Sequence, residues 1–229
     1  MDVVLEGIVG SHAYGLAGPD SDVDRLGIFA APTESFHGLH SPKDSYVTNN
    51  PDRTLHECAK WARLALSCNP TAMELVWLPE NLYETRTSLG DNLIDIRSSL
   101  LSSDRVKDAF LGYATQQFRR LESRQDGTFS SDLRNRTAKH ARHLYRLLFS
   151  GYMLYKTGRH RVKLDYPQVF IAFGERVAAG EIELAKTIMA HYEHKFDITS
   201  TPLPSQPNTD KIEEWLKRVR VYYWRNRDL

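Results

Sequence analysis

The stretch GSHAYGLAGPDSDVD, residues 10–24, places three aspartates within five positions directly after a glycine-rich turn. Like charges so close together are unfavourable unless a cation joins them. Asp22 and Asp24 are separated by one residue on a predicted strand, so their carboxylates point to the same face. Such a pair suits a hard divalent cation such as Mg²⁺, which prefers oxygen ligands and is commonly shared with substrate phosphates. Asp20, beside Pro19, is interpreted as a turn residue.

A buried strand is predicted just upstream, over residues 3–9, and it leads into Gly10 and Ser11. A strand followed by a glycine turn exposes backbone N–H groups that can bind phosphate oxygens. Taken singly, an acidic pair or a glycine turn is most often only a loop feature. Together, twelve residues apart, they indicate one site for a phosphate and a metal.

The composition restricts the class of protein. The 229 residues carry a formal net charge of +1, which gives no global argument for a nucleic-acid partner. Two cysteines, Cys58 and Cys68, are too few for a zinc cluster and are expected to be buried free thiols. The N-terminal residues lack the basic region of a signal peptide, and no apolar run reaches membrane-spanning length. We therefore expect a cytoplasmic, reduced protein without a membrane segment.

The order of predicted elements is that of an α+β protein. Strands are predicted over 3–9, 23–32 and 44–50. A helix is predicted over 54–68, because Thr54 and Glu57 match a capping box. Residues 73–79 fit either a strand or a helical turn.

Helical periodicity dominates from about residue 87 onward. The predicted helices cover 88–101, 102–124, 133–158, 177–196 and 211–227, with a connector rich in proline and serine over 199–210. The predicted domains are therefore an α/β catalytic core over 1–86 and a helical domain over 87–229.

The motifs resemble those of a known superfamily. Gly10-Ser11-His12-Ala13-Tyr14-Gly15 followed by Ser21-Asp22-Val23-Asp24 resembles the nucleotidyltransferase superfamily of DNA polymerase beta type. Closer still, the chain resembles the bacterial and phage branch of predicted nucleotidyltransferases associated with RNA repair. The motifs of that branch are matched by Asn69-Pro70, Glu74-Leu75, Lys139, His143, Arg146-Leu147 and Thr157-Gly158. The resemblance spans roughly residues 3–165.

The resemblance implies a fold, a reaction and a set of site residues. The fold would be a nucleotidyltransferase-type mixed β-sheet with helices, followed by a C-terminal helical bundle. The reaction would be in-line attack of a hydroxyl on the α-phosphate of a nucleoside triphosphate, with two Mg²⁺ (or Mn²⁺) ions and release of pyrophosphate. Asp22, Asp24 and a third acid would hold the metal. The predicted nucleotide-binding residues are Gly10, Ser11, Tyr14, Ser21, Lys139, His143 and Arg146.

The third carboxylate is open between Asp44, Asp52, Glu57 and Glu74. Asp52 is ranked first, because it lies between a possible strand and the helix that follows. Glu74 is second, because an acid in an apolar segment needs a partner or a metal. His12 departs from the family pattern, in which an arginine is expected. Which cation neutralises the phosphate charge at this position is therefore open.

Basic residues are concentrated between residues 133 and 164. This segment contains nine lysines and arginines and no acid. Lys139, His143 and Arg146 fall at i, i+4 and i+7, within about 60° on one helical face. A merely solvated helix face would normally include acids, so we expect this stripe to bind a triphosphate, an RNA backbone or both.

The C-terminal helix alternates arginine with tryptophan and tyrosine. Such a pattern can stack bases and bind phosphates. An amphipathic helix that docks Trp215, Val219 and Tyr222 on the core gives nearly the same pattern, and we favour this second interpretation.

The sequence therefore predicts a metal-dependent nucleotidyltransferase that acts on an RNA end, such as a tRNA 3′ end. One alternative is transfer to a protein or small-molecule hydroxyl, as in toxin-like or antibiotic-modifying relatives. Another is a non-catalytic module that binds nucleotide or RNA. The intact pair Asp22 and Asp24 argues against the non-catalytic module, which has no need of adjacent anions facing a phosphate.

Overall fold

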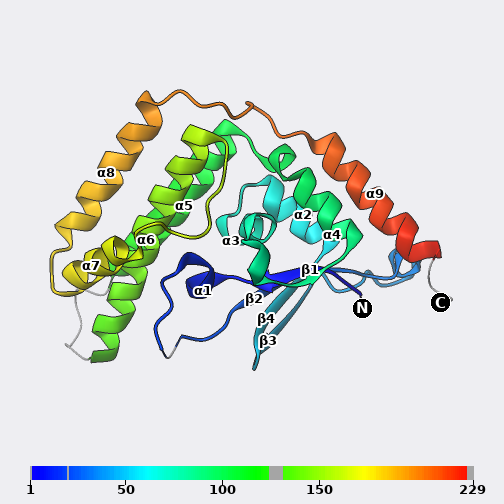
Figure 1. Cartoon of the computed structure of the whole chain (residues 1–229), viewed down its shortest axis with the longest axis horizontal. Coiled ribbons are helices and arrows are strands. Elements are labelled where there is room, and N and C mark those ends of the chain that lie inside the picture. The colour runs from blue at the N-terminus through cyan, green and yellow to red at the C-terminus, as the bar shows by residue number, and fades with distance from the viewer. Residues whose placement is uncertain (1, 20, 124–130, 226–229) are drawn as a thin grey trace. The chain divides into compact units, whose positions relative to one another are not determined.

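The computed structural model describes residues 2–19, 21–123 and 131–225, so Asp20 lies outside the described residues (Figure 1). The chain divides into two compact units. The first combines Met1–Leu101 with Gln206–Leu229, and the second is Ser102–Ser205. The sequence places the boundary at residue 87, whereas in the structure residues 87–101 and 206–229 group with the sheet.

The first unit is built on a five-stranded mixed sheet. Its strands are β1 (Asp2–Ile8), β2 (Arg25–Ala30), β3 (Ser45–Asn49), β4 (Asp52–Glu57) and β5 (Tyr83–Arg86), in the order β3-β4-β2-β1-β5. The β2–β4 pair is parallel, and the other neighbours are antiparallel. The three predicted strands are confirmed, and so is the α+β class.

Short helices complete the first unit around this sheet. The α-helices are α1 (Gly10–Tyr14), α2 (Cys58–Leu66), α3 (Pro70–Glu74), α4 (Ser88–Asp95) and α9 (Thr209–Arg225). Four 3₁₀ turns cover Thr33–His37, Leu75–Trp77, Glu80–Leu82 and Arg97–Leu100. The segment 73–79, left open between strand and helical turn, is helical as far as Trp77. Both cysteines are buried and free as expected, and burial raises the pKa of the Cys58 thiol.

The predicted capping box of the 54–68 helix is wrong. Residues 52–57 form β4, which pairs with both β2 and β3, and α2 begins only at Cys58. Glu57 is itself the N-cap, since its carboxylate accepts from the Ala59 N–H at 2.8 Å. The ladder hydrogen bonds and the burial of Leu55 in the sheet therefore prevail over the local helix signal.

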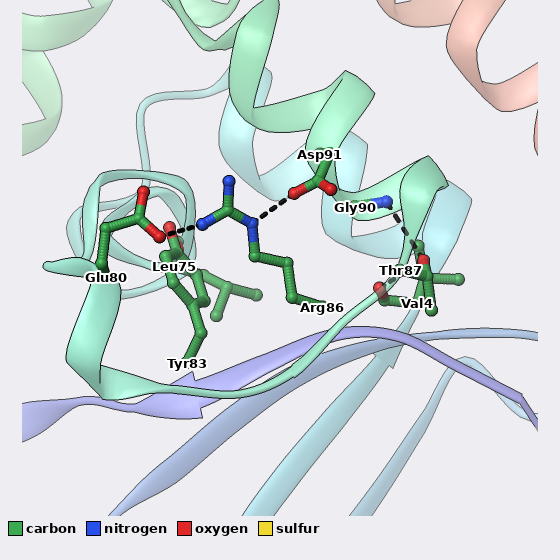
Figure 2. Close-up of polar contacts among 8 residues, drawn as sticks. All are labelled: Val4, Leu75, Glu80, Tyr83, Arg86, Thr87, Gly90 and Asp91. Atoms are coloured by element: carbon green, nitrogen blue, oxygen red, sulfur yellow. Dashed lines mark hydrogen bonds and ion pairs between the residues drawn. The ribbon is translucent and has the colours of Figure 1, made fainter.

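Polar contacts fix the turn from β5 into α4 (Figure 2). The Thr87 hydroxyl donates to the Val4 carbonyl at 2.7 Å and accepts from the Gly90 N–H at 3.2 Å, so it caps α4 while binding β1. The Arg86 guanidinium lies between the carboxylates of Glu80 and Asp91 and pairs with both. This edge strand is thus joined to the helices on either side of it in the chain.

Helix α9 packs on the first unit although it comes last in the sequence. Ile212, Trp215 and Val219 are buried, and the Trp215 indole N–H donates to the Leu89 carbonyl at 2.9 Å. Arg220 pairs with the buried Glu57 at 2.6 Å. The predicted docking of Trp215 and Val219 is confirmed. That of Tyr222 is wrong, because this side chain is exposed.

The second unit is helical. It consists of α5 (Ser103–Glu122), α6 (Ser131–Thr157), α7 (Pro167–Ala178) and α8 (Glu183–Ile198). Helix α6 packs against α5 where Gly151 meets the Phe110 ring, an approach that leaves no room for a Cβ. The predicted helix 177–196 begins too early, because the chain turns at Gly180, where φ is 111°, between α7 and α8. Over the described residues, no helix is long and apolar enough to cross a membrane.

Candidate functional site

The turn at Gly10 and the carboxylate of Asp24 form a single structure. Gly10 begins α1 directly after β1 with φ of +67°, a left-handed conformation that side chains rarely adopt. A Cβ at this position would lie 2.1 Å from the Asp24 Oδ2. Glycine is therefore required both by its φ and because a carboxylate lies against its Cα. The two motifs separated in sequence meet here.

Further contacts hold the segment between these motifs. The Val9 N–H donates to the Asp24 carbonyl at 2.9 Å, which continues the β1–β2 ladder by one residue. The His12 Nε2 donates to the Ser21 carbonyl at 3.1 Å, and the Ser21 hydroxyl accepts from the Gly18 N–H at 2.9 Å. His12, which departs from the family pattern, thus contacts the backbone before the carboxylate pair.

Asp22 and Asp24 lie in the extended segment just before β2, which begins at Arg25. The expectation that both lie on the strand is therefore wrong, because Asp24 precedes β2 by one residue and Asp22 by three. Asp22 is exposed, and Asp24 is partly buried against Gly10.

Asp52 is the first residue of β4, the strand parallel to β2. Since Arg25 is paired with Arg53, Asp24 and Asp52 each precede this pair by one residue on neighbouring strands. Neighbouring strands are about 4.8 Å apart. The register places Asp52 on the strand next to the one that Asp24 precedes, and its role as the third acid stays a prediction.

The other candidate acids have different contacts. Glu57 caps α2 and pairs with Arg220, so both of its oxygens are engaged. Asp44 lies 3.8 Å from the Lys60 ammonium. Glu74 is fully buried and accepts a hydrogen bond from the Tyr14 hydroxyl at 2.6 Å.

The Tyr14–Glu74 bond gives Tyr14 a place that the sequence does not suggest. Tyr14 is buried at the end of α1, and its hydroxyl points to a carboxylate on α3 rather than to solvent. The bond connects the helix that starts at Gly10 with the core of the unit. Tyr14 is therefore placed to hold α1, and its contact with a nucleotide stays a prediction.

Two arginines next to the acids in sequence are engaged elsewhere. Arg53 binds Glu6 through two hydrogen bonds of 2.5 and 2.7 Å, and Arg25 binds Glu84 at 2.8 Å. These partners raise the pKa of both guanidinium groups. Side chains alternate along a strand, so Arg25 and Arg53 lie on the sheet face opposite to that of Asp24 and Asp52. Sequence reasoning missed these pairs because each joins strands distant in the chain.

The donor set fits a hard cation at the carboxylate pair. Mg²⁺ is commonly held by one or two carboxylates together with substrate phosphates. Within residues 2–19, 21–123 and 131–225, no three histidine, cysteine or acidic side chains are grouped closely enough to hold a metal. Asp22 and Asp24 thus provide oxygen ligands, but in this structure Asp52 does not complete a group of three carboxylates with them.

The remaining predicted site residues lie on α6, in the second unit. Lys139 is exposed, whereas Arg146 is only 1% exposed and its guanidinium donates to the His143 Nδ1 at 3.3 Å. Burial, and then the charge of Arg146 and three further cations, lower the pKa of His143 to about 3. The predicted stripe is therefore not a uniformly exposed face. Leu144, Leu147, Leu148 and Gly151 of the same helix are buried.

Exposed cations are nevertheless numerous along the 133–164 segment. They are Arg134, Arg136, Lys139, Lys156, Arg159, Arg161 and Lys163. Two of them have acidic partners from beyond the segment: Arg134 lies 3.9 Å from Glu175, and Arg161 lies 3.0 Å from Asp165.

One comparison with known proteins gives a match. The model of a family described as RlaP, RNA repair pathway DNA polymerase beta family, matches residues 1–166. A comparison with curated proteins gives no match. The matched region contains the sheet, the Gly10 turn, all the candidate carboxylates and α6.

Proposed function

The chain belongs to the RNA repair pathway DNA polymerase beta family, and from this premise we propose that it is a metal-dependent nucleotidyltransferase. It transfers a nucleoside monophosphate from a nucleoside triphosphate to a hydroxyl of an RNA, such as a tRNA 3′ end, and releases pyrophosphate. The metal is Mg²⁺ or Mn²⁺.

The approach of Asp24 to Gly10 carries the proposal. Position 10 requires glycine for two reasons. Its φ of +67° is one that other residues rarely adopt, and a Cβ there would lie 2.1 Å from the Asp24 carboxylate. A turn needed only for chain reversal could have been built without bringing an anion against it. Here a phosphate-binding type of turn and a metal-binding type of side chain are adjacent, as transfer of a phosphoryl group requires.

We assign roles to the residues of this site. Gly10 and Ser11 bind the terminal phosphates through the first N–H groups of α1, whose N-cap residue Val9 supplies no side-chain bond. Asp22 and Asp24, with Asp52, hold the metal. When bound, the metal neutralises phosphate charge and stabilises the attacking and leaving oxygens. Tyr14 fixes α1 through Glu74, so that the turn is already in place before substrate binds.

An RNA acceptor is supported by two observations. The family is described by its place in RNA repair. The exposed cations of the 133–164 segment can neutralise a phosphate backbone, although triphosphate binding alone would use some of them.

The function is tested by following label from each α-labelled nucleoside triphosphate with Mg²⁺ or Mn²⁺ into total RNA and total protein. The test variant is Asp22→Asn/Asp24→Asn, which removes two charges with little change in shape. The matched control is Asp104→Asn/Asp108→Asn, which removes two charges from exposed positions on α5.

We expect label in RNA with the wild type and the control pair, and a loss of at least a hundredfold in the test variant. Label in protein alone would favour transfer to a protein hydroxyl and refute the RNA acceptor. Equal labelling by the wild type and the test variant would refute the metal site.

A further inference from the structure

The end of α9 and the segment 33–40 form one surface rich in exposed aromatic rings. We name it the α9 aromatic surface, and it comprises Phe36, His37 and Trp224. The exposed fractions are 40% for Phe36 and 51% for Trp224. The His37 and Trp224 rings meet edge to face at 5.9 Å. Two segments from opposite ends of the sequence therefore share this surface, and both belong to the first unit (Figure 1).

Arg220 adds two further contacts between α9 and the segment 33–40. Its guanidinium lies 4.1 Å above the Phe36 ring, and its backbone carbonyl accepts from the Thr33 hydroxyl at 2.7 Å. The surface is thus held in shape by contacts within the unit.

Docking of α9 does not account for the exposed rings. The helix is fixed by the side chains at 212, 215 and 219, which are buried. Trp224 lies about 180° around the helix from Trp215, on the side away from that buried stripe. Single exposed apolar side chains are common, but a group of rings on one surface is typical of an interaction site.

The charges around the rings are positive. Helix α9 carries its acids in its first half, at Asp210, Glu213 and Glu214, and none from residue 215 to 225. Lys217, Arg218 and Arg220 lie in this second half, where Arg220 pairs with Glu57 and Lys217 lies 3.7 Å from Glu213. Cations near a helix C-terminus are favoured by the helix dipole, but that effect does not require exposed aromatic neighbours. Across from α9, residues 33–43 contain one acid, Glu34, and one lysine, Lys43, so the excess of positive charge comes from α9.

Exposed rings among cations fit single-stranded nucleic acid, because bases stack on rings while phosphates meet the cations. A second copy of the chain would bring two positive surfaces together, which is unfavourable. We propose that the α9 aromatic surface binds a single-stranded segment of the RNA acceptor. The proposal rests on the proposed function for the identity of that RNA.

The position of the surface indicates which part of the RNA it would bind. Asp24 precedes β2, whereas the segment beginning at Thr33 follows the other end of the strand. The six residues of β2 span about 20 Å at roughly 3.3 Å per residue. The surface is therefore distant from the carboxylates, and it would hold nucleotides several positions away from the reacting end.

The test is the binding of fluorescently labelled single-stranded RNAs of 5 and 20 nucleotides to the full chain, measured by anisotropy without triphosphate or metal. We expect Phe36→Ala and Trp224→Ala each to weaken binding of the longer RNA by about fivefold to a hundredfold. Tyr166→Ala is the matched control, since this ring is 68% exposed but lies in the second unit. Melting curves confirm that each variant is folded.

Affinities of Phe36→Ala and Trp224→Ala equal to that of the wild type would overturn the proposal. So would a change in sedimentation of these variants with unchanged RNA affinity, which would assign the surface to a second copy. If the wild type transfers no nucleotide but binds RNA through Trp224, the proposed function fails and the RNA surface stands.

Discussion

His160 gives the stability of the protein a pH dependence that can be worked out from the structure. The imidazole is 5% exposed, beside the Phe110 ring, and burial followed by the charge of Arg146 lowers its pKa from 6.5 to about 3. The native state therefore keeps His160 neutral at pH values where the unfolded chain binds a proton. Stability is fully present above pH 6.5 and is lost progressively as the pH falls toward 3.

The size of the loss at pH 5 depends mainly on the unfolded pKa. One unit of pKa corresponds to 1.36 kcal/mol, and pH 5 lies 1.5 units below 6.5, so His160 alone reduces the free energy of unfolding by about 2 kcal/mol. Any native pKa below about 4 gives nearly the same figure. His143, whose pKa is also lowered to about 3, adds a similar loss.

The assay is urea unfolding followed by circular dichroism at pH 7.5 and pH 5, for the wild type and His160→Gln. Losses from other titrating groups are common to both proteins and cancel in the comparison. We expect the variant to lose about 2 kcal/mol less than the wild type between the two pH values. His191→Gln, at an exposed position on α8, is the matched control. An equal loss in the wild type and His160→Gln would refute the reasoning.

Three further outcomes are expected. Gly10→Ala should lower stability by about 1–2 kcal/mol and abolish nucleotide transfer, because the new Cβ displaces a carboxylate; Gly15→Ala, with φ of +76° but open space around it, should show the strain in a thermal melt and keep transfer activity. Tyr14→Phe should cost about 1–3 kcal/mol by depriving the buried Glu74 of a donor, and it should weaken binding of labelled triphosphate in equilibrium dialysis; unchanged binding would contradict its role in fixing α1. Arg220→Met should cost about 3 kcal/mol in urea unfolding by leaving the acid that caps α2 without its cation; a loss below about 1 kcal/mol would mean that this pair is not important for stability.

Much of the first unit was predictable from local pattern. Strands β1 and β2 are apolar segments whose hydrophobic signal matches their burial, whereas β3 is recognised by its β-branched and aromatic residues although it is mostly exposed. The short β5 and the polar β4 were not predicted. The prediction failed in β4 because Thr54 and Glu57 match the local pattern of a helix start. Their extended conformation comes from pairing with β2 and β3, which no local pattern shows.

The candidate site was predictable where its residues are close in sequence. Residues 10–24 contain both the turn and the carboxylate pair, so their association could be inferred, although not the contact of Asp24 with Gly10. The place of Asp52 beside Asp24 depends on a parallel register that no local signal encodes. The burial of Arg146 could not be predicted either, because a helical wheel does not show which polar residue a neighbouring helix covers.

The division of the chain has a consequence for synthesis. Glu57 is buried in the first unit, but its cation Arg220 comes from α9, which follows the whole helical unit in the sequence. Glu57 and Arg220 are 163 positions apart in the sequence. A ribosome adding about 5–20 residues per second needs roughly 8–32 s to make the residues between them. During that interval the sheet exists without the helix that completes it, while the helical unit can already fold. The part of the protein that carries the carboxylates is thus the last to be finished, and a chain interrupted before α9 has the sequence of the site without its complete support.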